Sequence, residues 1–133
     1  MKTDERLIEE LEEATRGLSF MSESDYPFEV FKWEGVASLT PEFLRGLTGH
    51  DPAAPVEALS AAEFFRAAAS EPAWKGGAEL AAARRFQALL RLLEENLSDL
   101  RVFRVGTINM PVYVVGRGPS GGLVGLSTRV VET

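Results

Sequence analysis

The aromatic segment 28–34 constrains the fold more strongly than any other part of the chain. Phe28 and Val30 point to one face of the predicted strand. Phe31 and Trp33 alternate with them and point to the other face. A strand with large apolar groups on both faces has to be covered by other elements on both sides. We therefore predict a sheet with helices above and below it.

Capping residues and apolar periodicity predict four helices. Serine, threonine and aspartate side chains bind the free N–H groups at a helix start, and glycine commonly ends a helix because it adopts left-handed conformations. The predicted helices lie between a cap at Thr3 or Asp4 and Gly17, between Thr40 and Gly49, after the capping box 60–63, and from about residue 78 to residue 97.

The last third of the chain predicts three further strands. They are expected at residues 102–105, 110–115 and 123–131. A short edge strand is expected earlier in the chain, at 55–59. The glycine-rich segment 116–122 is interpreted as a wide hairpin loop between the last two strands. Since no repeat or linker interrupts the pattern, we expect residues 1–133 to form one α+β domain with a mostly antiparallel or mixed sheet.

Charge is distributed unevenly along the chain. The formal net charge is −6, and residues 1–34 carry four basic and ten acidic side chains, while the two signs balance in the rest. An acidic region repels nucleic acids and anionic membranes, so neither is expected as a direct partner, whereas a basic protein is compatible. We expect the glutamates between residues 9 and 13 to lie mainly on the solvated face of the first helix.

The absence of certain features limits the function classes. The chain has no cysteine, which excludes a disulfide scaffold, a thiolate zinc site and a cysteine nucleophile. The first residues lack the apolar core of a secretion signal, and no stretch approaches the roughly 20 apolar residues of a membrane span. We expect a cytoplasmic protein that is monomeric when free.

Catalytic motifs are not evident. His50 is the only histidine; it could be a general base oriented by Asp51, but a turn residue is the better interpretation in a loop that contains Pro52. Carboxylates could still bind magnesium or calcium, although no EF-hand spacing is present. The segment 116–122 has no following Lys-Ser/Thr pair and leads into a strand, which disfavours a phosphate-binding loop. We predict no enzyme, no catalytic residues and no cofactor of the protein's own.

Two regions are not explained by packing. The segment 21–26 puts two acids, two hydroxyl groups and an aromatic ring into one polar loop. The segment 130–133 continues a strand to the last residue, which could hold a terminal carboxylate in a defined position. The alternatives are a solvated turn for the first region and a strand that simply ends for the second.

These two regions resemble the nuclease A inhibitor family of bacteria. Residues 17–35 carry the resemblance in the pattern Gly-Leu-x-Phe-Met-Ser-Glu-Ser-Asp-Tyr-Pro-Phe-Glu-Val-Phe-x-Trp-Glu-Gly. Further matching blocks are residues 48–50, the tryptophan of the 71–77 loop, residues 86–90, residues 112–114 and residues 127–133. The blocks keep their order and spacing over nearly the whole chain. The resemblance implies a three-layer α/β/α sandwich similar to the plant pathogenesis-related class 1 fold.

The resemblance also implies a function. Members of the family inhibit a sugar-non-specific DNA/RNA endonuclease of the ββα-metal class, which uses a magnesium ion. Glu23 would then enter the nuclease site where the scissile phosphate normally lies, and Thr133 would supply an oxygen ligand to the partner's magnesium. Trp74 would belong to a second contact patch, with a core tryptophan as the alternative. Asp25 would lie at the rim of the interface.

One position departs from the family pattern. An acid precedes the tryptophan in the family, whereas Ala73 precedes Trp74 in this chain. Loss of a charged contact would weaken or redirect the choice of partner. The alternative function is therefore an acidic interaction module of the same fold that binds a different basic protein.

Overall fold

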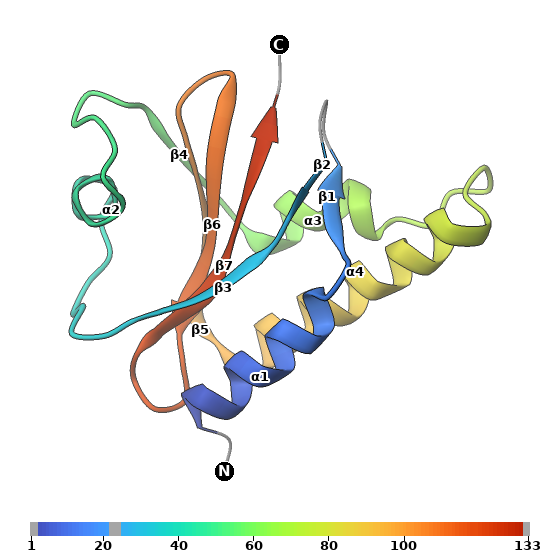
Figure 1. Ribbon diagram of the computed structural model, residues 1–133, viewed down its shortest axis with the longest axis horizontal. Helices are drawn as coiled ribbons and strands as arrows, with labels where there is room; N and C mark the ends of the chain where they lie inside the picture. The colour runs from blue at the N-terminus through green and yellow to red at the C-terminus, as the bar shows by residue number, and fades with distance from the viewer. Residues whose placement is uncertain (1–2, 22–24, 132–133) are drawn as a thin grey trace.

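A five-stranded antiparallel sheet forms the middle layer of the computed structural model, which describes residues 3–21 and 25–131. The strand order is β3-β7-β6-β5-β4. The strands are β3 (Glu29–Trp33), β4 (Val56–Leu59), β5 (Ser98–Val105), β6 (Asn109–Arg117) and β7 (Leu123–Val131). Of the helices in the described residues, α1 (Asp4–Thr15), α3 (Ala61–Ala69) and α4 (Gly77–Asn96) lie on one side of the sheet. Helix α2 (Pro41–Thr48) lies on the other (Figure 1). The predicted α/β/α sandwich is confirmed.

Helices α1, α2 and α3 begin at the predicted caps, α2 ends at the predicted Gly49, and α1 ends at Thr15, just before the predicted Gly17. Thr3 accepts a hydrogen bond from the first turn of α1, and Thr40 does the same for α2. Ser60 and Glu63 form a reciprocal capping box at the start of α3. Gly49 ends α2 with a φ of 76°, in the left-handed region that glycine tolerates.

The larger core lies between the sheet and the three helices on its first face. Leu7 and Leu11 of α1 are fully buried, as are Leu89 and Leu93 of α4. They pack with Phe28, which precedes β3, and with apolar side chains of the sheet, including Met110, Val112, Val114, Val124, Leu126 and Val130. This burial provides the main apolar contribution to stability.

The second face of the sheet has its own, smaller core. Leu44 of α2 is fully buried among apolar side chains of β5, β6 and β7. Phe31 and Trp33 pack at its border, with ring centroids 4.2 Å apart. Phe28 and Val30 belong to the opposite core, so the predicted two-sided burial of segment 28–34 is confirmed.

Two details of the predicted elements were wrong. The polar loop expected at residues 21–26 belongs to a hairpin, because strands β1 (Ser19–Met21) and β2 (Asp25–Pro27) lie at its two ends and pair with each other. Strand β5 begins at Ser98 rather than at residue 102. Its first residues contain a register shift, and Asp99 has a φ of 52°, so the bulge hides the alternation expected of a strand.

Candidate functional site

The β1–β2 hairpin carries the loop that contains Glu23. Met21 of β1 is paired with Asp25 of β2, and this is the pair that borders the loop. Glu23 itself lies outside the described residues. Asp25 is exposed, in keeping with a position at the rim of a surface.

The hairpin is fastened to the last strand of the central sheet. The hydroxyl group of Thr128 in β7 donates to the carbonyl oxygens of Pro27 at 3.0 Å and Tyr26 at 3.3 Å. A hollow of about 220 Å³ lies between the same two segments. The hairpin and the end of β7 point to the same edge of the molecule (Figure 1).

Strand β7 is held in the sheet up to its end. Val131 is in register with Asn109 of β6, so the last described residue still belongs to the ladder. Thr133 lies outside the described residues. The geometry therefore brings the segments that lead to Glu23 and to Thr133 to one edge of the molecule.

Trp74 lies on the surface, in the loop between α3 and α4. Its side chain is 74% exposed, so the alternative of a core tryptophan is wrong. Lys75 orders this loop, because its ammonium group donates to the carbonyl oxygens of Ala67, Ala68 and Ser70 at 2.9 to 3.4 Å. These carbonyls lie at the end of α3, where a cation also interacts favourably with the helix dipole. The ring of Trp74 is thereby presented from an ordered loop.

An apolar pocket of about 270 Å³ connects the Trp74 loop with the hairpin. Phe20 of β1, Ala67 of α3 and Ala82 and Phe86 of α4 line it together with Trp74. No pattern in the sequence indicates this pocket. The periodicity of apolar residues marks a helix face but does not reveal where alanines leave space between two helices.

The residues of the catalytic interpretation make other contacts. The Nε2 atom of His50 lies 2.9 Å from the hydroxyl oxygen of Tyr113. Asp51 accepts a hydrogen bond at 2.8 Å from the backbone N–H of Ala53, which is typical of a turn. Asp51 is thus engaged with its own loop, in agreement with the turn interpretation. Among the residues described, no group of three or more histidine, cysteine, aspartate or glutamate side chains is arranged to hold a metal.

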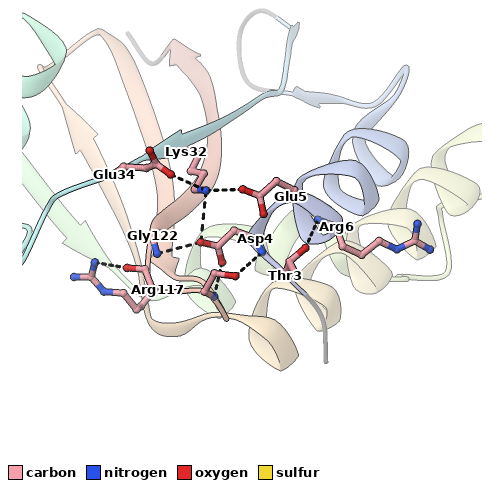
Figure 2. Close-up of polar contacts among 10 residues, drawn as sticks. Thr3, Asp4, Glu5, Arg6, Lys32, Glu34, Arg117 and Gly122 are labelled. Carbon is pink, nitrogen blue, oxygen red and sulfur yellow. Dashed lines mark hydrogen bonds and ion pairs between the residues drawn. The ribbon is translucent and has the colours of Figure 1, made fainter.

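A buried carboxylate occupies the glycine-rich hairpin loop. Asp4 is 1% exposed and accepts hydrogen bonds from the backbone N–H groups of Ser120 at 2.8 Å and Gly122 at 3.1 Å (Figure 2). The hydroxyl oxygen of Ser120 accepts a hydrogen bond from the backbone N–H of Asp4 in return. The predicted hairpin loop is confirmed, and its N–H groups bind an anion that belongs to the protein itself.

Lys32 lies beside this anchor and joins three carboxylates. Its ammonium nitrogen is 2.9 Å from both Glu5 and Glu34 and 3.9 Å from Asp4 (Figure 2). The hydrogen bonds that Lys32 donates to Glu34 and Glu5 raise the pKa of Lys32 above its ordinary value. The hydrogen bond from Lys32 is the main cause that lowers the pKa of Glu5. The pairs with Asp4 and Glu5 fasten α1 to β3. Lys32 is in register with Val124 at the start of β7, whereas the hairpin is attached nearer the end of that strand, through Thr128.

Comparison with models of known protein families gives a match over nearly the whole chain. None of the helices within residues 3–21 and 25–131 is long and apolar enough to cross a membrane. No curated protein matches the chain. A model of a protein family, described as nuclease A inhibitor-like protein, matches residues 5–133.

Proposed function

The chain belongs to the nuclease A inhibitor-like family, and from this premise we propose that it inhibits a magnesium-dependent, non-specific endonuclease of the ββα-metal class. The observation that carries the proposal is the attachment of the β1–β2 hairpin to β7 through Thr128. This attachment brings the segments that lead to Glu23 and Thr133 to one edge of the molecule, where a single cleft could receive both.

Each of the two residues has a chemical role in the proposal. A nuclease cleft is positively charged because it attracts phosphates, so the carboxylate of Glu23 would meet complementary charge. Magnesium prefers oxygen ligands and often keeps positions open for substrate phosphates. The hydroxyl and terminal carboxylate of Thr133 would occupy such a position on the partner's magnesium. The protein needs no cofactor of its own for this inhibition.

Blocking the C-terminus tests the metal contact. A short glycine-serine extension after Thr133 should reduce inhibition at least tenfold, because it removes the terminal carboxylate and obstructs entry to the cleft. The same extension before Met1 is the matched control and should leave inhibition unchanged. Inhibition by the unextended protein, measured in the same nuclease assay, is the reference value. Full inhibition by the C-terminally extended protein would contradict the metal contact.

Glu23→Gln tests the phosphate mimic independently. The variant keeps the size of the side chain and removes its charge, so we expect at least a tenfold weaker inhibition with an unchanged unfolding temperature. Glu12→Gln removes one charge from the exposed face of α1 and serves as the control.

A second candidate function follows from Ala73. The resemblance to the family implies an acid before Trp74, whereas this chain has Ala73, and this difference favours an acidic interaction module that binds a different basic protein. A panel of ββα-metal nucleases separates the two candidates. Inhibition of at least one member supports the first function. Inhibition of none, together with capture of a basic protein that is not a nuclease, supports the second.

A further inference from the structure

The apolar pocket beside Trp74 is formed before any partner binds. Small side chains, those of Ala67, Ala68 and Ala82, leave space between α3 and α4. Phe20 and Phe86 close the pocket on its inner side, with ring centroids 6.2 Å apart. Because Lys75 ties the loop to the end of α3, the wall that contains Trp74 is ordered as well.

The lining determines what kind of group the pocket can receive. Aromatic rings and alanine methyl groups make up most of its wall, so a phosphate or a sugar would lose its water without gaining hydrogen bonds. A large apolar side chain would instead bury its surface against these groups. The lining has two charged side chains, Lys75 and Glu79. The ammonium group of Lys75 already donates to carbonyl oxygens at the end of α3, whereas Glu79 is an exposed carboxylate. Its position favours an occupant with a basic neighbour.

The pocket lies next to the hairpin that leads to Glu23, and this position indicates which protein could fill it. Phe20 belongs to the same hairpin that leads to Glu23, so a protein seated on the tip of this hairpin would also pass over the pocket. We infer that the pocket receives one large apolar side chain of the nuclease, next to a basic residue that pairs with Glu79. This inference rests on the proposed function, and it adds a socket on the inhibitor to the exposed ring of Trp74.

Filling the pocket tests the inference. Ala67→Leu adds a branched side chain at an exposed position that lines the pocket. Ala62→Leu makes the same change at an exposed position of α3 outside the lining and is the matched control. We expect Ala67→Leu to raise the dissociation constant of the nuclease complex roughly tenfold or more, because the partner side chain loses its site. Ala62→Leu should leave the constant within about twofold of the wild type.

A second variant is independent of packing. Glu79→Lys reverses one exposed charge, which should not affect folding. We expect it to weaken the complex severalfold, with the larger part of the effect at low ionic strength. Isothermal titration calorimetry with one nuclease that the wild-type protein inhibits measures the dissociation constants of all variants.

The outcomes separate this inference from the function on which it rests. If the wild-type protein inhibits no nuclease, the proposed function fails and the inference fails with it. If the wild type inhibits but Ala67→Leu binds as tightly as Ala62→Leu, only the pocket assignment is overturned. A dimer of the free protein that Ala67→Leu dissociates would show that a second copy fills the pocket, and this result would also overturn it.

Discussion

At the scale of single residues, the carboxylate of Asp4 joins the first helix to the loop between the last two strands. It is buried and accepts two backbone hydrogen bonds from that loop. We predict that Asp4→Asn lowers the free energy of unfolding by about 1–3 kcal/mol, because an amide N–H₂ group would replace an acceptor that faces N–H donors. Urea unfolding measures the change.

The control for this prediction comes from the same helix. Glu12→Gln also neutralises one acid of α1, but at an exposed position, and should change the free energy of unfolding by less than about 0.5 kcal/mol. Nuclease inhibition by folded Asp4→Asn should equal that of the wild type, because the anchor lies beside the start of β7, whereas the hairpin is attached nearer the end of that strand. Equal stability of the two variants would show that the buried hydrogen bonds contribute nothing net.

Trp74 offers a second prediction at this scale. Its ring is 74% exposed, so Trp74→Ala removes little packing within the protein. We expect the unfolding temperature to stay within about 2 °C of the wild type while the affinity for the nuclease falls by roughly 2 kcal/mol or more, as for an aromatic interface anchor. Phe43→Ala is the control, because Phe43 is 47% exposed on α2, across the sheet. Equal affinities of the two variants for the nuclease would show that Trp74 does not belong to the interface.

Some residues of the candidate site could be predicted from the sequence, whereas the burial of Asp4 could not. Trp74 and the hairpin segment were identified by resemblance to a family, because their residue types belong to the sequence pattern that carries this resemblance. The burial of Asp4 was not foreseen, because an acid in the first turn of a helix is ordinarily exposed and interacts with the helix dipole. Its partners, Ser120 and Gly122, lie at the far end of the sequence, and no local pattern connects them to it.

At the scale of elements, the ion pairs that fasten α1 to β3 give a prediction for pH. Since the pKa of Glu5 is below its ordinary value of 4.5, its pairing with Lys32 stabilises the folded state above pH 4.5. This contribution is lost as the pH falls through the lowered pKa. The pKa of Lys32 is shifted in the opposite direction, upward. The contribution of its ion pairs to stability is therefore complete below pH 10.5 and is lost in more alkaline solution.

Glu5→Gln makes this prediction measurable. At neutral pH the variant should unfold at a lower temperature than the wild type. In acid the difference between the two unfolding temperatures should disappear. Added salt should reduce the difference, because Glu5 is exposed. Glu9→Gln is the control, as Glu9 is also an exposed acid of α1, but its ion pair is with Arg6 of the same helix. A difference that persists below the lowered pKa would contradict the assignment to this pair.

Most elements followed from sequence because their signals are local. Caps placed the helix starts, and the alternation of segment 28–34 correctly required two covered faces. The hairpin β1–β2 did not follow, since each strand has three residues and its sequence is that of a polar loop. The start of β5 was hidden by the left-handed Asp99 and its bulge. Both failures arise where long-range pairing overrides local preference.

At the scale of the whole molecule, the net charge of −6 predicts how the complex forms. An acidic surface steers the protein toward a basic cleft, so the association rate should fall as ionic strength rises. The triple variant Glu9→Gln, Glu12→Gln, Glu13→Gln should associate severalfold more slowly at low salt and dissociate at the wild-type rate. Stopped-flow kinetics at two salt concentrations checks this. An association rate of the wild type that does not depend on salt would rule out steering.

The position of β7 in the sheet also determines how late in synthesis the sheet can be completed. This strand lies inside the sheet, yet it is the last strand in sequence, and Glu29 of β3 pairs with Ser127 within it. Such distant pairing raises the contact order and slows folding. During synthesis β3 emerges from the ribosome long before its neighbour exists. The sheet is therefore completed only after translation of β7, and the hairpin reaches its place against Thr128 in the same late step.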